Sequence, residues 1–154
     1  MADFEIEEQA TIEENPALDI TEYLLSNQDI RSETAEVYPG DRFILNKLPF
    51  TIRVITDTEF DQWSKICTKT KTVKGKRTTD FDSTKFNELA CVNCTLKPNF
   101  KDAASIGRAG VHTPEQFLNK VLLPGEVTGL ATEISSFSGF DRTLEEEKDE
   151  LKNG

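Results

Sequence analysis

The residues of this chain that offer the widest chemistry are its three cysteines and its single histidine. Cys91 and Cys94 form a Cys-x-x-Cys pair, while Cys67 and His112 lie elsewhere in the sequence. Thiolates and imidazoles are ligands that Zn²⁺ prefers, so these side chains could supply a three-cysteine, one-histidine site, or the pair could act as a redox dithiol. A strong zinc signature has two paired ligand clusters, and this chain has one pair. Since buried free cysteine packs as a small apolar residue, we favour packing and expect no cofactor.

The other residues that could catalyse a reaction have simpler structural roles. His112 directly precedes Thr113, which has the sequence context of a helix N-cap, a position that is usually solvated. Asp80 and Asp82 could form a carboxylate pair, but Asp82 also directly precedes a predicted helix and is expected to cap it. The sequence contains no Gly-x-Ser-x-Gly string and no glycine-rich phosphate loop. We therefore predict that the protein is not an enzyme.

A basic stretch covers residues 65–77, with six positive charges and no acid. It could contact phosphate, and with Cys67, Cys91 and Cys94 it leaves open an alternative function as a small metal- or nucleic-acid-binding regulator. It lacks interleaved aromatic residues for base stacking, and the whole chain has a net charge of −10, so nucleic acid is not the favoured partner. The charge also fits an acidic protein surface, including the acidic tail of a neighbouring copy, so self-association stays open. We expect an exposed loop or hairpin here.

The negative charge of the chain lies at its two ends. Residues 1–20 contain seven acids and no base, residues 141–154 contain six acids and three bases, and the stretch between them is balanced. Both ends have too few apolar residues to offset the entropy of ordering them. We therefore predict a disordered acidic leader over 1–18, a single globular domain over 19–140 and a disordered tail over 141–154.

Hydrophobic periodicity predicts a small domain of mixed structure. Of the 154 residues, 36% are hydrophobic, but the longest aliphatic runs are three residues, so we predict no membrane span. The acidic N-terminus does not have the pattern of a signal peptide, which indicates a cytoplasmic protein. An amphipathic helix is predicted over 19–28, and two short strands, 42–45 and 50–56, are predicted to pair as a hairpin through the link at 46–49.

Helices are predicted for most of the remaining chain. Thr56 and Glu59 have the spacing of a capping box, and Thr113 followed by Pro114 is a second strong helix start. Further helices are predicted over 83–94 and from Pro124 to a stop at Gly139, with a loop or short helical turn over 101–108. The expected fold class is α+β and mostly helical, with a short N-terminal β-hairpin followed by about four helices and disordered acidic ends.

An ordered set of local signatures resembles the XkdN-like tail assembly chaperones of long-tailed phages and prophages. No single signature is specific, but together they cover about residues 40–141 in the expected order. They are Phe50–Thr56, Lys65–Thr68, Phe81–Asn87, Pro98–Asp102, Thr113–Lys120, Leu122–Glu126 and Ser138–Asp141.

This resemblance implies a non-enzymatic role in tail assembly in the host bacterial cytoplasm. Such chaperones bind the tape measure protein, a long, helix-rich, apolar chain, and keep it soluble until tail tube subunits polymerise around it. They are then displaced and are absent from the mature virion. The resemblance also implies contact with the major tail tube protein and, in related phages, a longer form made by ribosomal frameshifting, of which a chain ending at Gly154 would be the short counterpart.

A chaperone of this kind needs an apolar face for its partner. The helices that start at Thr113 and Pro124 have wide apolar stripes, and we expect part of this face to be shared between the core and the partner. On that interpretation, replacing Val127 or Leu130 with Asp weakens partner binding without unfolding the domain. The predicted partner-binding residues are Phe117, Val121, Val127, Leu130 and Ile134.

Overall fold

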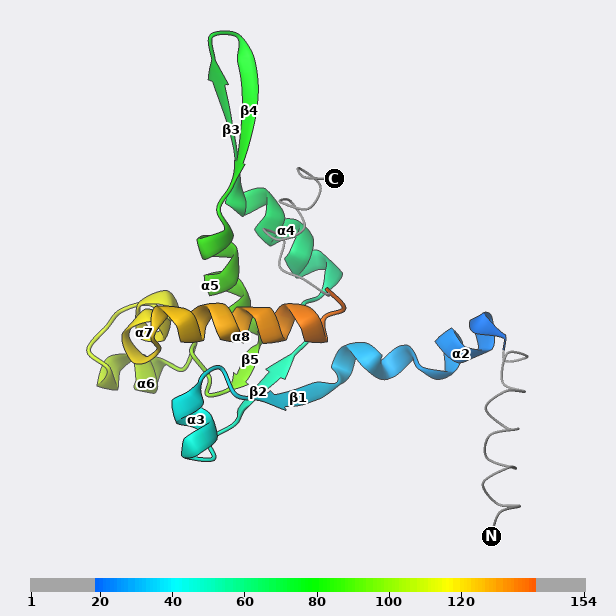
Figure 1. Ribbon diagram of the computed structural model, residues 1–154, viewed down its shortest axis with the longest axis vertical. Coiled ribbons are helices and arrows are strands. Elements are labelled where there is room, and N and C mark those ends of the chain that lie inside the picture. The colour runs from blue at the N-terminus through cyan, green and yellow to red at the C-terminus, as the bar shows by residue number, and fades with distance from the viewer. Residues whose placement is uncertain (1–18, 141–154) are drawn as a thin grey trace. The chain divides into compact units, whose positions relative to one another are not determined.

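The computed structural model of the chain describes residues 19–140 (Figure 1). The predicted disordered ends, 1–18 and 141–154, lie outside the described residues. The described residues divide into two units, with the division between Arg31 and Ser32. In the first unit, helix α2 (Ile20–Ser26) confirms the predicted amphipathic helix, and the backbone N–H of Thr21 donates to the carboxylate of Asp19 at its N-cap. The 3-10 helix η2 (Gln28–Ser32) follows α2.

A three-stranded antiparallel sheet lies in the second unit. Its order is β1 (Thr34–Val37), β2 (Phe50–Arg53) and β5 (Thr95–Lys97). The strand predicted over 50–56 is confirmed over 50–53 and ends earlier than predicted. Phe50 and Ile52 are buried, while Thr51 and Arg53 are half-buried. Phe50 pairs with Val37 and Ile52 pairs with Ala35, so the apolar side chains of β1 and β2 share one face.

The predicted hairpin of 42–45 with 50–56 is wrong. Residues 41–45 form the short helix α3 (Asp41–Leu45), and the partner strands of β2 are β1 and β5. Asn46 closes α3 because both its backbone N–H and its side-chain amide donate to the carbonyl of Arg42. The apolar residues of 42–45 fit either a strand or one helical turn, and tertiary contacts decide between them.

The predicted helices that follow are confirmed. Each begins at the expected cap: Thr56 and Glu59 form a full capping box, Asp82 accepts from the backbone N–H of Lys85, and Thr113 forms a capping box with Gln116. The stretch over 101–108 forms a short helix. The elements are α4 (Asp57–Cys67), α5 (Ser83–Cys94), α6 (Ala103–Arg108), α7 (Pro114–Val121) and α8 (Pro124–Phe137).

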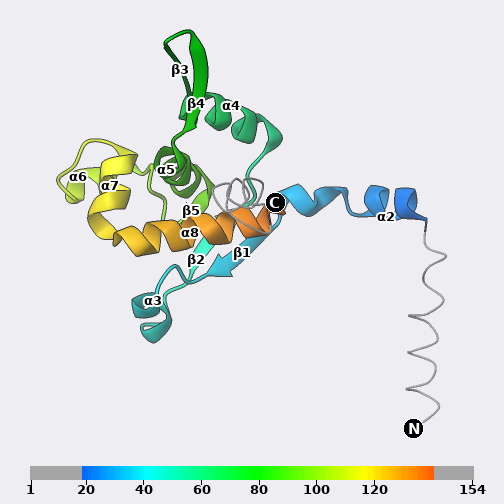
Figure 2. The ribbon, with the colours of Figure 1, turned by 45° about the horizontal axis from the view of Figure 1, so that its top comes forward.

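Helix α8 is the centre of the second unit. It packs along α5 and contacts β1 and β2, as the two ribbon views agree (Figures 1 and 2). Gly129 is needed at this crossing because a Cβ on it would lie 2.7 Å from the carbonyl oxygen of Pro39. Leu130 and Ile134, one turn apart on α8, are fully buried. The described residues therefore form an α+β, mostly helical fold with its core between α8, α5 and the sheet.

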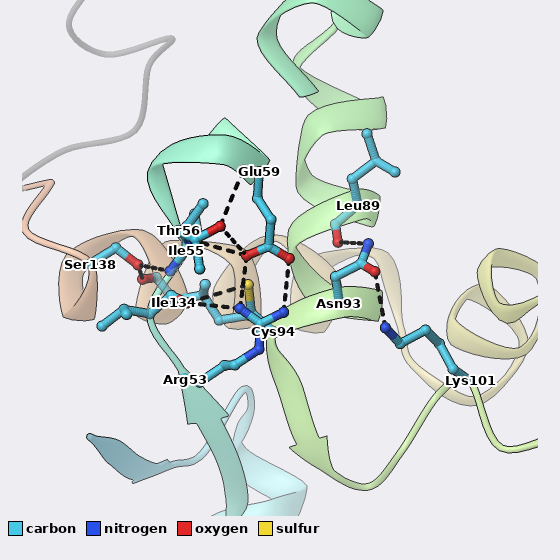
Figure 3. A network of polar contacts seen from close by, with 11 residues as sticks. Arg53, Ile55, Thr56, Glu59, Leu89, Asn93, Cys94, Lys101, Ile134 and Ser138 are labelled. Atoms are coloured by element: carbon cyan, nitrogen blue, oxygen red, sulfur yellow. Dashed lines mark hydrogen bonds and ion pairs between the residues drawn. The ribbon is translucent and has the colours of Figure 1, made fainter. Parts of the chain in front are cut away.

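Polar contacts fix the end of β2 to the neighbouring helices (Figure 3). The guanidinium of Arg53 donates to both carboxylate oxygens of Glu59, each at 2.8 Å, and so joins β2 to the first turn of α4. The backbone N–H of Ile55 donates to the hydroxyl of Ser138 just beyond α8, and that hydroxyl donates to the carbonyl of Ile134. These contacts join elements that bury the core and leave no open site.

Candidate binding groove

Four phenylalanine rings from separate segments form a continuous row. Phe43 of α3 meets Phe50 of β2 edge-on at 4.8 Å, Phe50 lies 6.4 Å from Phe100, and Phe100 meets Phe117 of α7 edge-on at 5.6 Å between ring centroids. Edge-to-face rings at such distances attract one another beyond the burial of their area. The row therefore joins the core to the surface between α3 and α7.

A groove of about 380 Å³ opens along this row. Its floor is part of the core, since Phe50, Phe100 and Leu122 are buried. Its rim is exposed: Leu48 is 57% exposed and Val121 is 39% exposed. Covering apolar side chains that are this exposed with a second apolar surface is favourable, because it removes their surface from water. The groove can therefore bind an apolar group.

Arg42 fixes the wall of the groove that α3 provides. Its guanidinium donates to both carboxylate oxygens of Glu126 on α8, at 2.7 and 2.8 Å, and to the carbonyl of Val121 at 2.6 Å. It also lies 4.6 Å from the centroid of the Phe43 ring. The hydrogen bonds from Arg42 lower the pKa of Glu126. Gly40 allows this arrangement, because a Cβ there would lie 2.9 Å from the Glu126 side chain.

Both charged side chains that line the groove are cationic. Glu126 neutralises Arg42, but among the described acidic residues none forms an ion pair with Lys97, the second cation. An apolar groove with one unneutralised cation at its edge favours an apolar segment that also has an acidic residue.

The predicted partner-binding residues divide into two groups. Phe117 and Val121 of α7 line the groove and keep exposed surface. Val127, Leu130 and Ile134 of α8 are buried in the core, at 8%, 0% and 0% exposure. For these three we now expect an Asp substitution to unfold the domain, while a role of the five residues in partner binding stays a prediction.

Sequence reasoning missed most of the groove. The sequence predicts Phe43 in a strand and Leu48 in a hairpin link, and it predicts no role for Lys97, although all three line the groove. They come from segments far apart in the chain, and no local pattern indicates that they meet. The only signal that could have pointed here was the surplus of apolar residues over 43–50, which exceeds what a four-residue strand can bury.

The three cysteines pack in the core. Cys67, Cys91 and Cys94 are free thiols with no exposed surface, and the Cys91 thiol donates to the carbonyl of Val127 at 3.4 Å. Burial raises the pKa of the Cys94 thiol to about 12, so it stays protonated and is a poor metal ligand or nucleophile at neutral pH. Within residues 19–140, no three His, Cys, Asp or Glu side chains are grouped closely enough to hold a metal ion.

His112 and Asp82 take part in the starts of helices, as the sequence predicts. His112 is exposed, and its backbone N–H donates to the side chain of Gln116 at 2.8 Å as part of the start of α7. Asp82 caps α5, and Asp80 lies opposite Lys69 in the antiparallel register of the hairpin formed by residues 68–81.

Every helix of the described part is too short or too polar to span a membrane.

The sequence matches the family model described as phage XkdN-like tail assembly chaperone protein over residues 21–152. This match spans most of the chain. It includes every element that forms the groove and the core of the second unit.

Two curated proteins of Bacillus subtilis (strain 168) are similar to this chain. The uncharacterized protein YqbN is 30% identical over 136 residues, which cover 85% of this chain and 91% of YqbN. The phage-like element PBSX protein XkdN is 27% identical over 136 residues, covering 85% of this chain and 92% of XkdN. The crystal structure of YqbN has the same fold, with a TM-score of 0.53 at 24% identity over 71% of this chain and 87% of that one.

Proposed function

Since the chain belongs to the phage XkdN-like tail assembly chaperone family, we propose that it binds the tape measure protein through the groove between α3 and α7. The observation that carries the proposal is the apolar groove itself, with a buried phenylalanine floor and an exposed rim. A tape measure protein is expected to be long, helix-rich and apolar. Its exposed apolar side chains are the kind of group that such a groove covers.

The size of the groove suits reversible binding. A volume of about 380 Å³ accommodates only a few large side chains, so one copy covers a short segment of a long partner. Many copies are then needed to keep the whole partner from aggregating. We expect each copy to bind weakly, because a groove of this size holds only a short segment and small contacts are typical of transient complexes. Weak individual contacts allow tail tube subunits to displace the chaperone, which is then absent from the finished virion.

The proposed role requires no catalysis and no cofactor. Tail assembly chaperone activity is non-enzymatic, and the groove offers shape, apolar surface and Lys97, which forms no ion pair with an acidic residue within 19–140. We place this activity in the cytoplasm of the host bacterium. The major tail tube protein, and a frameshifted longer form of this protein, are further partners that the proposal includes.

Co-expression with the tape measure protein of the same phage or prophage tests the proposal. The chain is expressed at its full length, and the soluble fraction is analysed by size-exclusion chromatography with light scattering. We expect the tape measure protein to become soluble and to co-elute with several copies of this chain. A tape measure protein that remains insoluble, with this chain eluting alone, refutes the proposed partner.

A further inference from the structure

The hairpin formed by β3 (Thr68–Val73) and β4 (Lys76–Phe81) contributes only its base to the core and does not line the groove. It confirms the hairpin expected for the basic stretch, and in both ribbon views it extends away from α4 and α5 (Figures 1 and 2). All residues from 68 to 80 are exposed, and Phe81 at its base is the first side chain to reach the core, against Phe86. A bond from the backbone N–H of Asp82 to the carbonyl of Cys67 closes the base.

The register separates the hairpin into two chemically different faces. Paired residues of antiparallel strands share a face. One face therefore has Thr70 opposite Thr79 and Thr72 opposite Arg77, whereas the other has Lys71 opposite Thr78 and Val73 opposite Lys76. The second face also has Lys69 opposite Asp80, so it presents Lys69, Lys71 and Lys76 along the arm, with one carboxylate near the base.

The exposed arm contributes little to the stability of the domain, so we expect it to bind a partner. A two-stranded hairpin with neither face covered is marginally stable in water. Both of its edges also have unpaired backbone groups, which can accept an additional strand. Exposed faces, free edges and positive charge together indicate a surface for an extended acidic segment.

The charge of the chain indicates where that segment comes from. Residues 68–81 contain five Lys or Arg and one Asp, a net charge of +4, in a chain whose total is −10. Residues 1–20 contain seven acids and no base. Opposite charges concentrated on separate segments of one sequence attract two copies of it to each other. Nucleic acid would be repelled by the acidic remainder of the chain, and the exposed residues 68–80 of the arm include no aromatic side chain for stacking bases.

We propose that the β3–β4 hairpin binds the acidic residues within 1–20 of a second copy of this chain. Such a contact joins two different surfaces, so a pair of copies keeps one hairpin and one leader free, and further copies can add head to tail. A row of copies could cover a long, extended partner such as the proposed tape measure protein. The contact between copies is argued only from the charges and the hairpin, so it does not depend on whether the chain binds the tape measure protein.

Sedimentation velocity of the full-length chain at about 20 mM and about 500 mM NaCl tests this contact, because salt screens exposed charges. We expect oligomers at low salt and monomers at high salt. Reversing two lysines of the arm, Lys69→Glu with Lys71→Glu, is expected to weaken association about tenfold or more, from several surface charge pairs lost or reversed. The matched control reverses two exposed cations elsewhere, Lys85→Glu with Arg108→Glu, and is expected to associate as before.

The acidic partner segment is tested separately. Replacing Glu5, Glu7 and Glu8 with Gln is expected to abolish association at low salt, while replacing the tail residues Glu145, Glu146 and Glu147 with Gln leaves it unchanged. The leader variant leaves the hairpin intact, so it keeps the test valid if the lysine variant fails to fold. Mixing the Lys69→Glu, Lys71→Glu chain with a Glu5→Lys, Glu7→Lys chain is expected to restore association.

Three results overturn the proposal. The first is a chain that is monomeric at both salt concentrations. The second is association that the arm and leader variants leave unchanged. The third is binding of a labelled 20-nucleotide DNA or RNA that depends on Lys69 and Lys71, with no association of the chain, which would make the hairpin a nucleic-acid arm.

Discussion

The rim of the groove allows partner binding to be separated from folding. Leu48 and Val121 line the groove and are 57% and 39% exposed, so truncating them removes apolar surface that the folded monomer has not buried. We expect the double variant Leu48→Ala, Val121→Ala to fold as the parent does and to bind the tape measure protein more weakly. Leu130→Ala, by contrast, removes a fully buried side chain and is expected to lower stability by about 2–5 kcal/mol.

The size of the binding loss follows from the exposed fractions. Burying a whole Leu or Val side chain is worth about 1.5–3 kcal/mol. The 57% of Leu48 that remains exposed accounts for about 1–2 kcal/mol at most, and the 39% of Val121 for about 1 kcal/mol or less. Together they correspond to a loss of affinity of about 10–100-fold, since each 1.4 kcal/mol is a factor of ten.

The assay combines thermal unfolding with titration of the co-purified tape measure protein by biolayer interferometry. Ile66→Ala is the matched control, because Ile66 is 52% exposed on α4 and does not line the groove. The reasoning is refuted if the double variant and the control bind equally well. It is also refuted if the double variant unfolds at a clearly lower temperature than the parent, because its side chains would then belong to the core.

Three further predictions concern stability and reactivity. The pKa of Glu126 is lowered in the folded protein, so its ion pair with Arg42 stabilises the fold at a pH above 4.5, the ordinary pKa of a glutamate. This stabilisation is lost as the pH falls through the lowered pKa. In urea unfolding, we therefore expect Glu126→Gln to be less stable than the parent at pH 7 and equally stable at low pH. Gly129→Ala is expected to destabilise the protein by about 1–3 kcal/mol through a backbone clash, whereas Gly125→Ala in the same helix, with open space around it, is neutral or slightly stabilising in the same urea unfolding measurement. The thiols of Cys91 and Cys94 are expected to react with Ellman's reagent only on unfolding, because burial excludes the reagent and raises the pKa of each thiol; rapid reaction in native buffer would contradict their placement in the core.

Local signals predicted the helices well. The capping box at Thr56 and Glu59, the cap at Asp82 and the Thr113–Pro114 start each satisfy backbone donors within one helical turn. Such bonds depend only on residues three or four positions apart, so the sequence is sufficient to locate them. The charged hairpin was foreseeable for the same reason, because its strands are neighbours in the chain.

Pairing between distant segments was not predictable. The strands β1 and β5 are four and three residues long, and each is defined by its contact with β2. Residues 42–45 have a pattern that suits a strand, yet they form α3, where Arg42 reaches a carboxylate 84 positions away. A short apolar run is compatible with either structure, and the sum of tertiary contacts selects one.

The sequence by itself determined the resemblance to the family, the capped helix starts at Thr56, Asp82 and Thr113, the basic arm and the concentration of acid at the ends. Only the tertiary structure decided which apolar residues are available to a partner. Phe117 and Leu130 both lie on apolar stripes, but one lines an open groove and the other is fully buried. Periodicity identifies the apolar face of a helix, whereas burial depends on what other segments pack against that face, and those segments are distant in sequence.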